Sequence, residues 1–67
     1  MVVLEMARHY DRVQFEHETV QEAAASAIDD LDHDMAWPVS IIEDGQEVWR
    51  QNGPFGDCID KLRELAA

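Results

Sequence analysis

The sequence predicts an α+β domain with the element order β-α-β-β-α, in which a small three-stranded sheet carries two helices packed on one face. Three observations support this prediction. Residues alternate in polarity before His17 as in a half-buried strand, a capping signal at Thr19 opens a helical stripe, and Asp44-Gly45 is a hairpin signal. At 67 residues and 46% apolar composition, the chain is expected to form one small acidic domain over residues 1–67, with a narrow stability margin.

The first strand is expected between residues 2 and 17. Val13 and Phe15 alternate with polar neighbours, which is the period-two pattern of a strand with one buried face. The preceding run Val2-Val3-Leu4 is compatible with an additional edge strand or with a frayed end. The sheet is therefore predicted to have three strands, with one strand before the first helix.

The first helix is predicted from a capping box, because the hydroxyl of Thr19 can accept a hydrogen bond from the backbone N–H of Glu22. Apolar residues then recur at spacings of three and four, which predicts one buried helix face about four turns long: Val20, Ala23, Ala24, Ala27, Ile28, Leu31 and Met35. Four aspartates follow where the helix dipole is negative, and each is unfavourable there by about 0.3–1 kcal/mol: Asp29, Asp30, Asp32 and Asp34. Either these aspartates have a function, or the helix ends near Leu31 and a solvated acidic loop follows.

A hairpin and a second helix complete the predicted domain. The hairpin strands are expected at residues 37–42 and 46–51, joined by the two-residue turn Asp44-Gly45. Asn52-Gly53-Pro54 breaks the pattern, and Pro54 suits the first turn of a helix. The apolar stripe of this second helix recurs at helical spacing: Phe55, Cys58, Ile59, Leu62 and Leu65.

The hairpin register decides which side chains are exposed. With a two-residue turn, Ile41 stands opposite Val48, and both face the core. Ile42 and Trp49 then share the other, uncovered face of the sheet, where they would form an apolar contact patch. The alternative is that Trp37 and Trp49 cap the small core from its edges. A homodimer through the open sheet face would be compatible with both interpretations.

The negative charge of the chain limits the classes of molecule that it can bind. The chain carries 15 acidic residues against 5 Lys and Arg, for a net charge of −10. Residues 13–49 hold no lysine or arginine but ten of the acids: Glu16, Glu18, Glu22, Asp29, Asp30, Asp32, Asp34, Glu43, Asp44 and Glu47. This balance argues against direct binding of nucleic acid or of anionic membranes, and it favours a protein partner with a basic surface.

The single cysteine and the apolar start of the chain predict a cytoplasmic location. Cys58 has no second cysteine to pair with, which fits a reducing compartment. The opening apolar run, Met1-Val2-Val3-Leu4, is too short for the hydrophobic region of a signal peptide or for a membrane span.

Metal and catalytic sites are not expected. Acids alternate from Asp30 onward as in a calcium loop, but Met35 and Ile41 occupy the positions that need glycine and a bidentate glutamate. Cys58 lies on an apolar stripe, where a thiol is a poor nucleophile. No pair of histidines has the spacing of zinc ligands: His9, His17 and His33. We therefore expect no cofactor, no metal and no enzymatic activity.

The hairpin region resembles short uncharacterised proteins of actinobacteria and their phages. The resemblance covers about the middle third of the chain, in the run Trp37-Pro38-Val39-Ser40-Ile41-Ile42-Glu43-Asp44-Gly45-Gln46-Glu47-Val48-Trp49. It lies in a structural hairpin, so no residue inherits a role from it. It implies a phage or mobile-element origin, and small acidic proteins from such sources often look like inhibitors of host proteins.

The leading hypothesis from the sequence is a non-enzymatic protein-interaction module, such as an inhibitor or modulator of a host protein. Two alternatives are a nucleic-acid mimic that blocks a DNA- or RNA-binding protein, and a small structural homodimer. The residues expected to bind the partner combine the predicted apolar patch with the acidic surface that would steer association: Ile42, Trp49, Glu22, Asp29, Asp30, Asp32 and Asp34.

Overall fold

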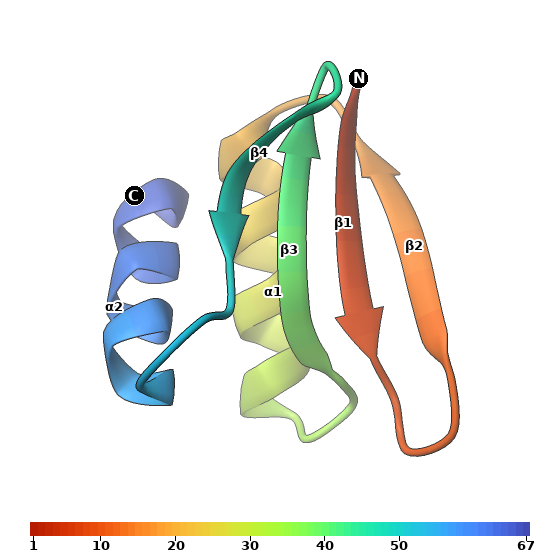
Figure 1. The fold of residues 1–67 in the computed structure, drawn as a ribbon, viewed down its shortest axis with the longest axis vertical. Coiled ribbons are helices and arrows are strands. Elements are labelled where there is room, and N and C mark those ends of the chain that lie inside the picture. Colours follow the sequence, from red (N-terminus) through yellow and green to blue (C-terminus); the bar gives the residue numbers. More distant parts are fainter.

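The computed structural model describes the whole chain, Met1–Ala67, and contains a four-stranded antiparallel sheet with two helices. Along the chain the elements are β1 (Val2–Ala7), β2 (Arg12–His17), α1 (Val20–Asp32), β3 (Trp37–Glu43), β4 (Gln46–Arg50) and α2 (Phe55–Ala66). In space the strands follow the order β2-β1-β3-β4 (Figure 1). The α+β class is confirmed, whereas the predicted three strands and the order β-α-β-β-α are wrong.

The error lies in β1, which is a central strand between β2 and β3. Its core-facing residues are all buried: Val2, Leu4 and Met6. The loop between β1 and β2, Arg8-His9-Tyr10-Asp11, contains no glycine or proline, and its ends are joined by a hydrogen bond of 2.8 Å from Arg8 N to Asp11 O. Because the loop has neither glycine nor proline, the strongest turn signals, residues 2–17 look like one extended segment when only the sequence is read.

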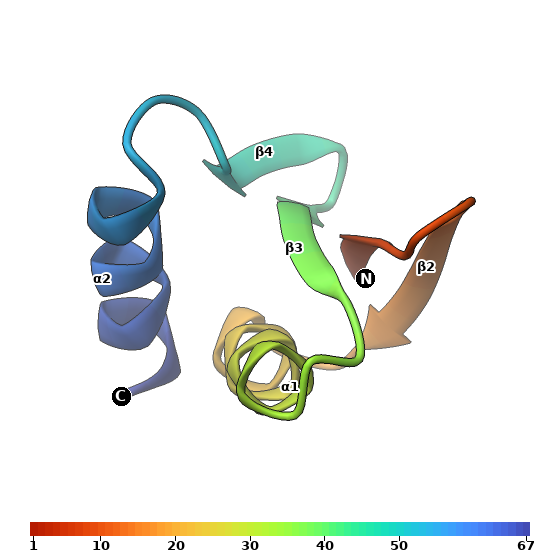
Figure 2. The same cartoon turned by 90° about the horizontal axis from the view of Figure 1, so that it is seen from below.

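The helices lie on one side of the sheet and leave the other side uncovered. The chain leaves β2, passes behind the sheet as α1 and returns as β3, a right-handed crossover with β1 between its two strands (Figure 1). The second helix, α2, packs against α1 and stands beside β4 (Figure 2). Neither helix is long and apolar enough to cross a membrane. The core between these layers contains twelve buried residues: Val2, Leu4, Met6, Ala23, Ala24, Ala27, Ala36, Ile41, Trp49, Cys58, Ile59 and Leu62.

The first helix begins as the sequence predicts. The Thr19 hydroxyl accepts a hydrogen bond of 3.1 Å from Glu22 N, and three alanines of the predicted face are buried where the helix approaches the sheet. The helix ends at Asp32, and His33 forms its C-cap. Asp34 has a left-handed backbone with φ of 55°, and Met35 is exposed. The interpretation of a helix ending near Leu31 is therefore closer to the structure than a helix continuing to Met35.

The second hairpin contains a β-bulge that the sequence did not reveal. Asp44 and Gly45 both have positive φ, 51° and 84°, as the two central residues of the predicted turn require. Past the turn, Ile42 pairs with Glu47, but Ile41 pairs with Trp49. Val48 is the extra residue between these two pairs.

The bulge reverses the predicted facing of the β4 side chains. Trp49 is only 5% exposed and belongs to the core, whereas Val48 is 40% exposed. The predicted pairing of Ile41 with Val48 is therefore wrong, and so is the predicted exposure of Trp49. A single inserted residue has this effect because successive side chains on a strand point to opposite faces.

Candidate interaction surface

No element covers the sheet face opposite α1, which we call the open face (Figure 2). Residues of all four strands form it, alternating in β1 and β2 and shifted by the bulges in β3 and β4, and Ser40 is the one that is buried: Val3, Glu5, Ala7, Arg12, Gln14, Glu16, Trp37, Ser40, Ile42, Glu47 and Arg50. Half-buried apolar residues, Val3 and Ile42, lie side by side on β1 and β3. Charged residues surround them on the outer strands β2 and β4. An apolar centre with a polar rim is the usual composition of a protein interface.

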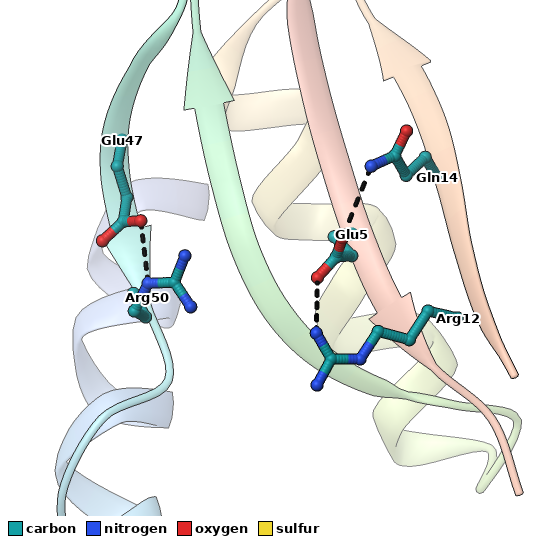
Figure 3. A network of polar contacts seen from close by, with 5 residues as sticks. All are labelled: Glu5, Arg12, Gln14, Glu47 and Arg50. Atoms are coloured by element: carbon teal, nitrogen blue, oxygen red, sulfur yellow. Dashed lines mark hydrogen bonds and ion pairs between the residues drawn. The ribbon is translucent and has the colours of Figure 1, made fainter.

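Two polar contacts on the open face converge on Glu5, in the central strand β1. Arg12 Nη1 donates to Glu5 Oε2 at 3.2 Å, and Gln14 Nε2 donates to Glu5 Oε1 at 3.4 Å (Figure 3). The Glu5 side chain is 23% exposed, so these donors offset part of the cost of removing its carboxylate from water. Cross-strand pairs of this kind each contribute roughly 0.2–1 kcal/mol.

The β4 side of the open face carries a third polar contact. Arg50 Nε donates to Glu47 Oε2 at 2.7 Å. Figure 3 shows the guanidinium groups of Arg50 and Arg12 on the two sides of β3, each extending toward the other. Each arginine is held by one glutamate through one nitrogen, which leaves its other N–H groups free to bind a further acceptor.

A hollow of about 450 Å³ lies between these two arginines. Its walls include two large exposed aromatic side chains, Trp37 at 45% and Phe55 at 43%. The Trp37 ring is held edge-on by His9, with ring centroids 5.5 Å apart. Arginine and tryptophan are among the residues most enriched at interaction hot spots. This hollow is therefore the part of the open face best suited to bind a partner.

The structure separates the two residues of the predicted apolar patch. Ile42 lies on the open face as predicted. Trp49 lies on the opposite side of the sheet, where its Nε1 donates to the backbone oxygen of Cys58 at 3.0 Å. Trp49 therefore has no surface to offer a partner. The sequence predicts Trp37 only as a cap of the core, because its place on the open face beside Ala7 depends on the unrecognised strand β1.

The predicted acidic residues lie away from the open face, at two ends of α1. Glu22 is in the first turn, and Asp29, the nearest of the four aspartates, follows seven residues later, roughly 10 Å along the helix axis. None of the four aspartates forms an ion pair with lysine or arginine. The structure therefore gathers the aspartates with one another, but not with Glu22 or Ile42.

His33 lies among these aspartates, as the C-cap of α1. Its Nδ1 lies 2.7 Å from the backbone oxygen of Asp29 and 3.5 Å from the Asp29 carboxylate. The hydrogen bond to the backbone oxygen, together with the negative charge of Asp29, raises the pKa of His33 above its usual value of 6.5. The aspartates thus favour a protonated histidine at the end of α1, where a cation also suits the helix dipole. No three His, Cys, Asp or Glu side chains are placed to hold a metal ion.

The thiol of Cys58 is buried and hydrogen-bonded within the fold. Its Sγ donates to Asn52 O at 3.1 Å and accepts from Asn52 N at 3.3 Å, so the buried thiol ties the start of α2 to the segment after β4. A hollow of about 440 Å³ beside it is lined by charges of both signs, Arg50 and Lys61 against Glu47 and Asp57. This mixture gives the hollow no clear preference for an anion or a cation.

No protein-family model, curated protein or solved structure matches the chain. The function is therefore argued from the residues of this chain alone.

Proposed function

We propose that the chain is a small, non-enzymatic, cytoplasmic interaction module that binds a partner protein through its open face. The observation that carries this proposal is the hollow between Arg12 and Arg50, with Trp37 exposed in its wall. Trp37 takes the role that the sequence assigned to Trp49. Ile42 keeps its expected role, as part of the apolar centre of the same face.

The geometry favours a partner with two chemical features. The free N–H groups of Arg12 and Arg50 fit a carboxylate on the partner, since a guanidinium donates two parallel hydrogen bonds to that group. Trp37 and Ile42 fit an apolar side chain beside it. The net charge of −10 attracts a partner whose overall charge is positive, which raises the rate of association more than the final affinity.

In this proposal the aspartates at the end of α1 act at long range. Asp29, Asp30, Asp32 and Asp34 lie outside the open face, so they contribute to the field that steers the partner and make no contact in the bound complex. Their effect should be screened by salt, because the Debye length is about 8 Å at physiological ionic strength. The resulting complex would inhibit or modulate a host protein.

A capture experiment with matched variants tests the open face. Tagged protein would be used to capture partners from nuclease-treated host lysate, with Trp37→Ala compared against Met35→Ala. Both substitutions remove an exposed apolar side chain, but Met35 lies at the end of α1 and not on the open face. We expect Trp37→Ala to lose a partner that the wild type and Met35→Ala retain, while circular dichroism shows that the variant remains folded. Retention of every partner by Trp37→Ala would contradict the proposal.

A nucleic-acid mimic is the second candidate, favoured by the absence of any lysine or arginine partner for the four aspartates. It makes the opposite prediction for the same capture experiment. The partner would be a nucleic-acid-binding protein that is displaced by DNA, released at high salt and insensitive to Trp37→Ala. Replacing all four aspartates by asparagine would abolish that binding, whereas it would only slow association with the open face.

A further inference from the structure

We propose that two copies of the chain pair antiparallel through the free edge of β2 and join their sheets into one continuous sheet. This inference concerns the edge of the sheet, and it does not depend on the proposed binding at the open face. It rests on three observations: an unprotected edge strand, the direction of its backbone groups, and a register in which its charges are complementary.

The two edges of the sheet differ in protection. The β4 edge, with five residues, is interrupted by the bulge at Val48 and flanked by α2 (Figure 1). The β2 edge has six residues in unbroken register with β1 and contains no proline, glycine or bulge. Proteins normally blunt exposed edges with such devices, because an open edge pairs readily with another strand. The β2 edge is therefore the one prepared to accept a further strand.

The backbone of β2 presents alternate residues outward. At the hairpin, Arg8 N donates to Asp11 O, and hydrogen-bonded pairs alternate along an antiparallel ladder. On the other side of β1, Met1 O accepts from Asp44 N, so the backbone groups of the odd-numbered β1 residues point to β3. The even-numbered β1 residues therefore bond to β2, in agreement with the hairpin. The backbone groups that point toward β1 belong to Val13, Phe15 and His17. Those that point to the free edge belong to Arg12, Gln14 and Glu16.

Only one register of two β2 strands combines full overlap with opposite charges. With the two-fold axis at Gln14, Arg12 of each copy stands opposite Glu16 of the other, and all three outward-facing residues form backbone pairs. Centring the axis on Arg12 or on Glu16 instead places like charges face to face, which is unfavourable. The intermediate shifts pair Gln14 with Arg12 or with Glu16 and lose the ion pairs.

The same register also pairs apolar side chains on the helix side of the sheet. Val13 of one copy stands opposite Phe15 of the other. Phe15 is 38% exposed in the single chain, although it points to the side where the core lies. Next to it lies a hollow of about 390 Å³, in which Phe15 and the exposed Met35 are the two apolar lining residues among polar ones such as Ser26 and Asp30. The two-fold axis keeps both α1 helices on one side of the joined sheet, so Val13 and Phe15 of both copies face the side that carries the helices.

Two complementary charge reversals test this interface. The oligomeric state of the wild type, Glu16→Arg and Arg12→Glu would be measured by sedimentation at physiological salt, each alone and the two variants mixed. Each variant alone places like charges opposite each other at both ends of the seam, and we expect its dimerisation to weaken about tenfold or more. In the mixture, each Arg faces a Glu at both ends, so a heterodimer should form. A wild type that is monomeric on the order of 100 µM, or a mixture that does not associate, would overturn the proposal.

A pair of variants at Gln14 separates edge pairing from folding. Gln14→Pro and Gln14→Thr both lose the side-chain contact with Glu5, but only proline removes the outward-pointing backbone N–H. We expect Gln14→Pro to be a folded monomer and Gln14→Thr to remain dimeric, and a dimeric Gln14→Pro would exclude the β2 seam. Trp37→Ala should stay dimeric, so a failure of the open-face proposal is distinguishable from a failure of this one.

Discussion

The indole Nε1 of Trp49 donates to the backbone oxygen of Cys58 at 3.0 Å, and this hydrogen bond joins the last strand to the last helix inside the core. Both residues are buried. The contact satisfies the polar atom of a large buried aromatic side chain and the carbonyl oxygen it meets. The bulge at Val48 is what makes it possible, because it turns Trp49 toward α2.

Trp49→Ala should therefore unfold or severely destabilise the domain. Removing a buried tryptophan costs about 3–5 kcal/mol, most of the stability that so small a domain can have. Trp49→Phe keeps most of the apolar volume but loses the hydrogen bond to Cys58, so it should cost less. Val48→Ala, at the neighbouring exposed position, should change stability by about 0.5 kcal/mol or less. Urea unfolding followed by circular dichroism measures all three, and a Trp49→Ala protein as stable as Val48→Ala would contradict the assignment of Trp49 to the core.

Two glycines should respond oppositely to alanine. Gly45 has φ of +84°, where an L side chain is strained, so Gly45→Ala should destabilise the domain by about 1–2 kcal/mol. Gly56 lies in the first turn of α2 with open space around the position of a Cβ, so Gly56→Ala should stabilise it by roughly 0.4–1 kcal/mol. Thermal unfolding of both variants checks this. Shifts of the melting temperature in the same direction would show that one of these backbone conformations is wrongly assigned.

The Thr19 cap should matter for the stability of α1. Thr19→Ala removes the acceptor for Glu22 N and is expected to cost about 1 kcal/mol. Thr19→Ser keeps a hydroxyl in the same place and should retain most of the stability. Chemical denaturation distinguishes the two variants. Equal losses for serine and alanine would mean that Thr19 contributes through the packing of its methyl group, and that its hydroxyl does not act as a cap.

Local signals predicted the elements of the fold well. The capping box at Thr19, the alanine face of α1 and the turn at Asp44-Gly45 are short-range features, and each appears where the sequence placed it. They could be predicted because capping and turn geometry depend on a few neighbouring residues. The strand β1 was missed because its connection to β2 lacks the glycine or proline that would have marked a turn.

The composition of the surface was harder to predict than the elements. Which aromatic side chain is exposed depends on one extra residue, Val48, and no turn or proline signal marks that bulge in the sequence. The error moved Trp49 from the open face into the core. Similarly, Arg12 and Arg50 are far apart in sequence. They line one hollow because the strand order β2-β1-β3-β4 places β2 and β4 in the same sheet, on the two sides of β1 and β3. Long-range pairing of this kind cannot be read from local patterns.

The stability of the domain should include a component that depends on the protonation of His33. Its pKa is raised in the folded state, first by the hydrogen bond to the Asp29 backbone oxygen and then by the Asp29 carboxylate. A raised folded-state pKa means that this stabilisation is fully present below the unfolded value of about 6.5 and is lost as pH rises through the folded value. Melting temperatures of the wild type and His33→Gln should therefore differ more at pH 5.5 than at pH 8.5.

An NMR titration of the His33 ring measures the same effect directly and separates its two causes. The wild-type ring should titrate above 6.5. Asp29→Asn removes the carboxylate charge but keeps the backbone oxygen, so it should lower the pKa of His33 without removing the whole shift. If His33 titrates at or below 6.5 in the wild type, the C-cap contact does not persist in solution.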